Sequence, residues 1–320
     1  MAAQMNATPS APPMGVAYLY LALSMTLVGL YVGLSPILVA MFPVMLLAWL
    51  RFAVAALAML PWLAPDSADA PLRRQDHALL FLQSLLGNFL FTILALQGTA
   101  LAGATSAGVV MAGLPACVAL LSRLFLAEPL SPRIGWAAGC TAAAVTLLAL
   151  QRETASSPLP ILNAPAQSAG SWPSLALGYL LLLGAVVCEA SYVVIGKRLV
   201  ARIRPPRLTA IINLWGLALS TPLGVLLAMG FDFGAIALPS WALLTFYALA
   251  ASMVTVWLWM KGLQRVPAQQ AGVFTVFLPL SSAAVGVGLL NEPWGLAHAA
   301  ALLLAVLAVW MVTRPERVAP

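Results

Sequence analysis

Charged residues are scarce in this sequence. Asp, Glu, Lys and Arg together account for 8% of the 320 residues, whereas about 25% is usual in a soluble globular chain. Hydrophobic residues account for 62%, against roughly 45–50% in such chains. So few charges could not cover so large an apolar core in water. The composition therefore excludes nucleic-acid binding, intrinsic disorder and a secreted disulfide scaffold, and it predicts an integral membrane protein.

Side chains that carry out chemistry are also few. The sequence has two histidines, nine acidic residues and three cysteines, Cys117, Cys140 and Cys188, each within an apolar segment. An odd number of cysteines in such segments indicates small buried hydrophobes and implies neither a disulfide nor a metal site. The acids are not clustered at metal-ligand spacing, and no phosphate-binding loop of the form G-x-x-x-x-G-K-[ST] occurs. We therefore expect no catalytic residues, no metal, no cofactor and no direct use of ATP.

Ten apolar stretches are long enough to cross a bilayer, since about 20 helical residues span a hydrocarbon core of about 30 Å. They are separated by Pro, Gly and charged residues. The predicted spans are Met14–Leu34, Pro43–Leu63, His77–Leu96, Ala102–Leu126, Pro132–Leu150, Trp172–Gly196, Leu208–Gly230, Pro239–Met260, Ala268–Leu290 and Pro293–Thr313. The sequence predicts an all-α polytopic membrane protein with ten transmembrane helices.

The basic residues indicate how these spans are oriented. If the N-terminus is cytoplasmic, twelve of the 15 Lys and Arg residues fall in cytoplasmic connections, only Arg152 falls on the other side, and Arg51 and Arg123 lie within spans. Positive residues are enriched on the cytoplasmic side. Both termini are therefore predicted to be cytoplasmic, in a cell (inner) membrane, and the Pro-, Ser- and Ala-rich connection Gln151–Ser171 is an external linker.

The two halves of the chain contain the same pattern. Ala107–Pro129 and Ala271–Pro293, whose numbering differs by 164, are identical at nine of 23 positions without a gap. In both, a proline, Pro115 or Pro279, is followed thirteen residues later by Glu-Pro. Chance similarity between apolar helices does not explain this spacing. The halves are therefore predicted to be two copies of one unit.

The duplication extends toward the start of each half, where a shift of 162 maps Gly29 onto Ser191. Each copy has five predicted spans, an odd number, so the second copy enters the membrane from the opposite side. The predicted organisation is a cytoplasmic tail (1–13), a first five-helix repeat (14–150), the external linker (151–171), a second repeat (172–313) and a second cytoplasmic tail (314–320). Inverted repeats of this kind predict a site between the halves near the middle of the membrane.

The pattern AG-x5-LP-x12-EP in both halves also resembles a known family. It is preceded by ALQGTALAGATS (Ala95–Ser106) in the first half and by GLQRVPAQQ (Gly262–Gln270) in the second. This resembles the EamA-type repeat of the drug/metabolite transporter superfamily, whose members are similar to this chain in length, in ten spans and in two five-helix halves. The resemblance implies a central cavity lined by the first four helices of each half, with the fifth and tenth spans peripheral. Glu189, in the first helix of the second half, departs from the general pattern.

Glu189 and Arg51 are the charged residues with the clearest functional interpretation. Glu189 lies eight residues before Lys197, which is about 12 Å inside the membrane boundary along a helix. An ionisable group at that depth is functional by default and could bind a substrate amine or carry a proton. Arg51 lies about 12 Å from the opposite boundary, its guanidinium suits a substrate carboxylate, and the repeat places Asn213 opposite it. A structural ion pair between Arg51 and Glu189 is the alternative.

Uncharged polar and aromatic side chains within the spans are further candidates for the cavity wall. Ser252 and Thr255 would lie there in preference to lipid. The residues that we expect to contact substrate, besides Arg51 and Glu189, are Asn88, Asn213, Tyr192, Trp215, Gln270 and Trp259. For the aromatic residues, the alternative location is the membrane interface.

Pro115, Glu128, Pro279 and Glu292 are the repeated motif residues, and we expect the two glutamates to be structural. Each glutamate precedes a proline that should open the next helix, where an acid meets the positive end of the helix dipole. The prolines within the fourth and ninth spans would bend those helices or line the cavity.

Together these features predict a secondary transporter that works by alternating access, because an inverted repeat lets the same contacts face either side. The family resemblance favours export of amino acids or related small metabolites. Proton-coupled efflux of drugs or toxic analogues is the alternative within transport, and a membrane-embedded enzyme or a structural subunit is the alternative outside it. The expected partners are a small-molecule substrate and the lipid bilayer, with Gly135 and Gly139 in the fifth span as a possible homodimer face.

Overall fold

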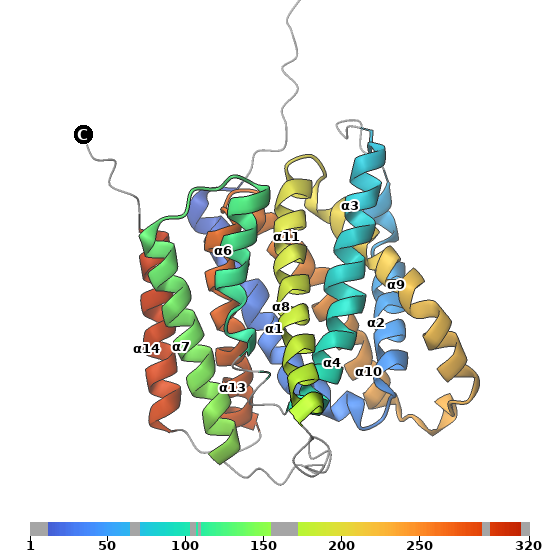
Figure 1. The fold of residues 1–320 in the computed structure, drawn as a ribbon. Helices are drawn as coiled ribbons and strands as arrows, with labels where there is room; N and C mark the ends of the chain where they lie inside the picture. Colours follow the sequence, from blue (N-terminus) through green and yellow to red (C-terminus); the bar gives the residue numbers. More distant parts are fainter. Residues whose placement is uncertain are drawn as a thin grey trace, which may run out of the picture.

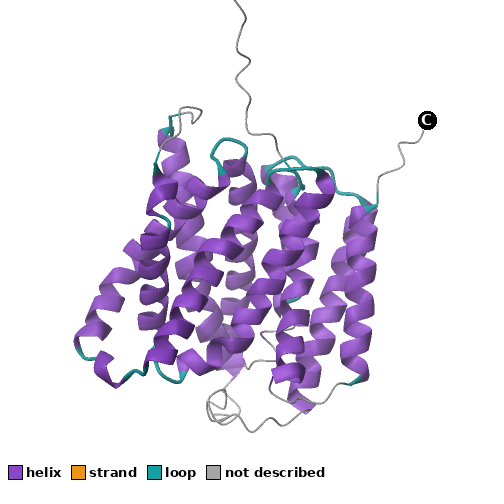
Figure 2. Cartoon of the chain, turned by 180° about the vertical axis from the view of Figure 1, so that it is seen from behind, coloured by secondary structure: helices purple, strands orange, loops and turns teal. Residues whose placement is uncertain are grey.

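Helices make up the regular structure of the described part of the chain (Figure 2). The computed structural model describes residues 12–64, 71–102, 107, 110–154, 172–289 and 295–314. Six helices there are long and apolar enough to cross a membrane: Met14–Val32, Arg74–Ala102, Pro173–Val200, Pro205–Met229, Leu238–Leu263 and Leu296–Thr313. Two shorter apolar helices are Val44–Ala58 and Leu114–Phe125. The helices lie side by side as a bundle (Figure 1).

The elements of the two halves follow the same order. The first half comprises α1 (Met14–Val39), α2 (Val44–Ala58), η1 (Leu60–Leu63), α3 (Arg74–Ser84), η2 (Leu85–Leu90), α4 (Phe91–Ala102), α6 (Leu114–Phe125) and α7 (Pro132–Thr154). The second half comprises α8 (Trp172–Val200), α9 (Pro205–Met229), η3 (Phe233–Ala235), α10 (Leu238–Ala248), η4 (Leu249–Val254), α11 (Thr255–Leu263), α12 (Ala268–Val273), η5 (Phe274–Val276), α13 (Phe277–Leu289) and α14 (Leu296–Thr313). The segments η2 and η4 are π-helical turns inside long continuous helices.

Pro115 and Pro279 follow interruptions of the helical path. In the first half a turn at Ala112 and Gly113 precedes α6, and Pro115 is the second residue of that helix. In the second half the 3-10 segment η5 precedes α13, and Pro279 is its third residue. A proline has no N–H, and its ring clashes with the carbonyl four residues earlier. The predicted fourth and ninth spans are therefore not continuous α-helices, because each changes geometry just before its proline.

The two halves are interleaved. Helix α1 packs against α11 and α13 of the second half, whereas α8 packs against α4 and α6 of the first half. We call α4, α6 and α8 the first bundle, and α1, α11 and α13, together with α12, the second bundle. Helices α2 and α9 pack against each other, as do α7 and α14, which form a pair at one edge of the molecule (Figure 1). The edge position of α7 and α14 agrees with the peripheral fifth and tenth spans that the family resemblance implies.

Two close helix contacts reveal the internal symmetry. A Cβ at Gly98 of α4 would collide with Leu182 of α8, and a Cβ at Gly262 of α11 would collide with Leu21 of α1. The numbers of the two glycines differ by 164, and those of the two leucines differ by 161. The contacts are therefore equivalent, and the shift for the opening helices is 161 rather than the predicted 162.

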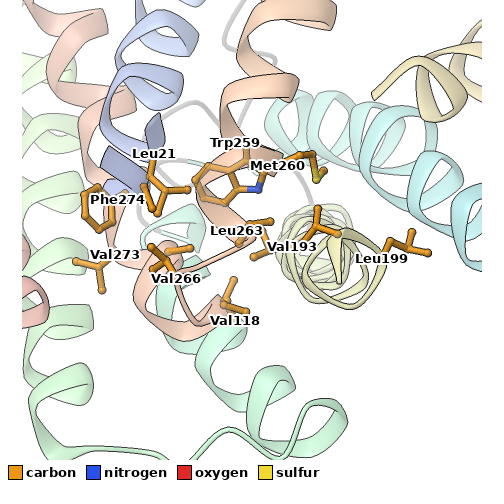
Figure 3. Packing of buried hydrophobic residues seen from close by; sticks show 14 of the residues in the cluster. Leu21, Val118, Val193, Leu199, Trp259, Met260, Leu263, Val266, Val273 and Phe274 are labelled. Atoms are coloured by element: carbon orange, nitrogen blue, oxygen red, sulfur yellow. The ribbon is translucent and has the colours of Figure 1, made fainter. Parts of the chain in front are cut away.

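Figure 3 shows side chains of the largest apolar cluster of the described residues packed against one another. Ala17, near the start of α1, and Val312, near the end of α14, both belong to it, so it lies at the end where the chain enters and leaves the helices. We call this cluster the plug. Its members include Leu21, Val118, Val193, Trp259, Leu263, Val266, Ala271, Val273 and Phe274.

The glycine contacts predict a stability difference. Gly98→Ala and Gly262→Ala should each lower the free energy of unfolding by about 1–3 kcal/mol, because the added methyl overpacks a helix crossing. The measurement is thermal unfolding of the purified protein in detergent. Gly139→Ala in α7 is the matched control, since none of the described atoms lies within 4 Å of its Cβ position. Equal melting temperatures for all three variants would contradict the predicted overpacking, and a loss in only one of the two crossing variants would contradict their equivalence.

Candidate functional site

A cavity of about 340 Å³ lies between the two bundles, also bordered by α2 and α9. Its wall includes residues of α1, α2, η2, α4, α6, α8, α9, η4, α11, η5 and α13. This volume is within the range of small-molecule sites. Because both halves contribute to its wall, the cavity is the candidate site.

Arg51 and Glu189 are the charged residues on the wall of this cavity. The guanidinium of Arg51 lies over the ring of Phe52, at 4.5 Å from the centroid, and its Nε has no hydrogen-bond partner in the described part of the chain. Among the described residues, neither side chain has an ion-pair partner within 4.0 Å. The predicted structural ion pair between Arg51 and Glu189 is therefore not formed, and both charges are left to interact with the contents of the cavity.

The aromatic side chains near these charges follow the internal repeat of the chain. Tyr31 of α1 and Tyr192 of α8 are related by the shift of 161, and both line the cavity. Tyr247 packs edge-on against Tyr31 at 5.3 Å between centroids, and Gln83, the counterpart of Tyr247 at the shift of 164, donates to the carbonyl of Tyr192. The shift that relates the tyrosines also relates Glu189 to an apolar residue, Val28, which lines the cavity as well. The tyrosine is thus present in both halves, whereas the carboxyl group of Glu189 is present in the second half only.

The π-helical turns η2 and η4 are related by the shift of 164 and contribute Asn88 and Ser252 to the wall. Turns of this type are rare and are frequent at functional sites. Asn213 of α9 donates its Nδ2 to the carbonyls of Thr209, at 2.9 Å, and Ser252, at 2.8 Å. Its amide nitrogen is therefore engaged in bracing η4. Ser84, which directly precedes η2, donates to the carbonyl of Ile212 at 2.8 Å, so α9 braces both turns.

The hydroxyls of Ser252 and Thr255 and the indole Nε1 of Trp259 lack hydrogen-bond partners among the described residues. All three residues line the cavity and are at most 5% exposed. They follow one another at spacings of three and four residues, which places them on one face of the η4–α11 helix. We call Ser252, Thr255 and Trp259 the donor face.

Two predicted substrate contacts do not line this cavity. Trp215 is 36% exposed and packs edge-on against Phe81, at 5.0 Å between centroids. It lies two residues after Asn213, which is roughly 200° around the helix, and so it points away. Gln270 lies in α12, where it accepts a hydrogen bond from Tyr18 of α1 at 3.4 Å. The cavity wall instead includes Arg51, Glu189, Asn88, Asn213, Tyr192 and Trp259, together with Thr92, Thr275 and Leu278, which no sequence pattern indicated.

The predicted local role of Glu128 is wrong. Helix α7 begins at Pro132, so Pro129 opens no helix and Glu128 does not lie at the start of α7. The carboxylate of Glu128 instead accepts hydrogen bonds from the backbone N–H groups of Ala268 and Gln269, which begin α12 in the other half. Its counterpart Glu292 lies outside the described residues.

The bracing contacts of Asn213 predict its contribution to stability. Asn213→Leu removes two buried hydrogen bonds at nearly unchanged volume and should lower the free energy of unfolding by about 1–3 kcal/mol. Asn88→Leu is the control, because its amide nitrogen donates to the Ser84 hydroxyl at 3.1 Å, and loss of this one bond should cost less. Thermal unfolding in detergent measures both. An Asn213→Leu variant as stable as the unmodified protein would show that Asn213 does not brace the turn.

Comparisons with known proteins agree with this architecture. The family model described as the EamA-like transporter family matches residues 15–150 and again 176–314. A relative from Bacillus subtilis (strain 168), "Uncharacterized transporter YetK", is 29% identical over 286 residues, which cover 88% of this chain and 82% of the relative. A solved structure titled "Crystal structure of protein" shares the fold with a TM-score of 0.70 at 19% identity, over 93% of this chain and 96% of that one. The chain belongs to the EamA-like transporter family, with one copy of the family unit in each half.

Proposed function

We propose that this protein is a secondary transporter that exports an amino acid or a closely related zwitterionic metabolite by alternating access. In this proposal the chain has ten spans in two inverted five-helix halves, and both termini are in the cytoplasm of a cell with an inner membrane. Membership of the transporter family and the twelve-to-one distribution of basic residues support it.

The observation that carries the proposal is the pair of unpaired opposite charges on one cavity wall. A charge buried between helices is costly without a partner. Arg51 and Glu189 have no ion-pair partner among the described residues. A substrate with one carboxylate and one ammonium group would satisfy both, which is the charge pattern of an amino acid.

The donor face adds to the binding capacity for the carboxylate. Helical Ser and Thr side chains commonly donate to the carbonyl four residues earlier. Six of the described residues do so, at 2.6–2.9 Å: Thr92, Ser191, Ser220, Thr221, Thr245 and Ser281. Ser252 and Thr255 do not, and Ser252 lies in a turn whose backbone bonds span five residues. Their free hydroxyls, the Trp259 N–H and Arg51 are all donors, which suits an anionic group.

Two of the three positions of the donor face have no polar counterpart in the first half. The counterparts of Thr255 and Trp259 at the shift of 164 are Phe91 and Ala95. The carboxylate is therefore proposed to bind near Arg51 and the donor face, and the ammonium group near Glu189. A purely cationic drug would leave the donor face unsatisfied, so the amino-acid proposal is preferred to drug efflux.

Transport by purified protein in proteoliposomes tests the substrate class. We expect uptake of radiolabelled L-leucine to be inhibited by other amino acids but not by 3-methylbutylamine, which lacks the carboxylate. Thr255→Val should raise the KM for leucine by about tenfold, because it removes one hydrogen bond to a charged group. Thr141→Val is the matched control, since Thr141 is a threonine of α7 that is buried and unpartnered among the described residues, away from the cavity. Preference for the amine over a panel of amino acids would favour drug efflux instead.

A second experiment tests proton coupling through Glu189. Glu189→Gln preserves side-chain shape but cannot exchange a proton, so it should fold normally and lose accumulation driven by an imposed pH difference. Exchange of labelled for unlabelled substrate, which needs no net proton movement, should persist. Wild-type transport that is indifferent to the pH difference would exclude the proton role, and unimpaired accumulation by Glu189→Gln would exclude this residue.

A further inference from the structure

The short connection between α11 and α12, residues 264–267, is held at both of its ends by side chains of other helices. On one side, Nζ of Lys197 in α8 donates to the carbonyls of Leu263, at 2.7 Å, and Val266, at 2.9 Å. Leu263 is the last residue of α11 and Val266 lies in the connection that follows, where backbone acceptors lack helical partners. Lys197 therefore holds the connection through two of its backbone carbonyls, at the side where it leaves α11.

Glu128 fixes the other end. Its Oε1 accepts from the N–H of Ala268 at 3.0 Å, and its Oε2 accepts from the N–H of Gln269 at 3.3 Å and from the hydroxyl of Ser122 at 2.7 Å. The side chain of Gln269 returns a bond to the carbonyl of Pro129 at 2.8 Å. Bonds to a charged group are stronger than those between neutral groups. We call Glu128 and Lys197 the latch.

The latch joins the two bundles. Lys197 belongs to α8, and Glu128 follows α6, so both come from the first bundle, whereas the connection that they hold lies in the second. The plug occupies the same region: Leu263, Val266 and Ala268 belong to it. At the crossing of α6 and α12, a Cβ at Gly272 would lie 3.3 Å from that of Val118. Polar and apolar contacts thus close the same end of the cavity.

We propose that the latch must release each time the cavity opens toward the end of the molecule where α1 begins, and that it biases the empty transporter toward keeping this end closed. The bias follows from the asymmetry of the repeat. At the shift of 161, the counterpart of Lys197 in the first half is Pro36, which has no donor. The sequence therefore supplies the lysine of the latch in the second half only, and this asymmetry favours the form in which the latch is made.

Thiol accessibility in lipid nanodiscs tests this inference. In a chain whose Cys117, Cys140 and Cys188 are replaced by Ala, Ala271→Cys places a reporter in the plug, where Ala271 is fully buried. We expect Lys197→Met and Glu128→Gln each to increase the rate of labelling by a membrane-impermeant maleimide by about tenfold, because loss of the latch raises the open population. The inference rests on the alternating access proposed above, but the assay contains no substrate, so failure to find a transported compound leaves it unaffected.

Two controls make the outcome decisive. Lys261→Met removes a lysine from the last turn of α11 whose Nζ lies 5.2 Å from the ring centroid of Trp257, outside the latch, and it should label at the unmodified rate. Ala305→Cys, buried in α14, reports general unfolding and should stay unlabelled in every variant. Unchanged labelling in both latch variants, or an equal increase in Lys261→Met, would overturn the proposal. Labelling at position 305 together with 271 would also overturn it, because the latch residues would then maintain the fold and not a gate.

Discussion

A polar group between membrane-spanning helices needs a partner, since no water is available there to replace one. The arrangement of helices in this protein depends on how that requirement is met. Ser24 donates to the carbonyl of Thr255 and Ser84 to that of Ile212, so that each polar side chain joins its helix to another. Asn213 joins α9 to η4 through its bond to the carbonyl of Ser252, and Lys197 joins α8 to the α11–α12 connection through two bonds. These polar side chains therefore hold helices together, and only Asn213 among them lines the cavity.

Of the eight buried side-chain atoms that lack a hydrogen-bond partner in the described part of the protein, four belong to residues that line the cavity. Nε of Arg51, the hydroxyls of Ser252 and Thr255, and Nε1 of Trp259 are buried donors without acceptors there. Leaving such a group unsatisfied costs about 1–3 kcal/mol. The neighbouring backbone is bonded, since the carbonyls of Ser252 and Thr255 accept from Asn213 and Ser24. The backbone of this wall is thus fixed while its side-chain donors stay available, which is the arrangement expected of a preorganised binding surface.

The fold class and the family could be predicted from the sequence because they depend on coarse and repeated features. The sequence alone shows the apolar stretches and the Pro115–Glu128 spacing that recurs at the shift of 164. The sequence also predicted that Arg51 and Glu189 border one cavity, and both line it. The reason is that a charged side chain within a span is costly in lipid and faces the interior of the bundle. Side-chain direction was less predictable. Trp215 was assigned to the cavity by residue type, although its helical phase relative to Asn213 turns it outward.

Contacts between distant parts of the chain were beyond reach of the sequence. Glu128 bonds to Ala268 in the other half, and nothing local distinguishes that role from capping the next helix. The π-helical turns η2 and η4 have no composition that marks them; they became visible only as equivalent irregularities in the two halves. The repeat indicates that η2 and η4 correspond to each other, but it does not indicate that their backbone is π-helical.

Val193 and Trp259 belong both to the cavity wall and to the plug. A substrate on the donor face therefore touches a side chain that helps to close the cavity, and separation of the bundles at the plug moves part of the binding wall. A ligand can shift an equilibrium only by the difference in its affinity for the two states. In the proposed binding mode that difference has a physical source, because Trp259 lies both in the cavity wall and in the plug. The latch adds a fixed preference for the closed form that occupancy of the cavity must offset, and so binding, closure and direction are linked through α11.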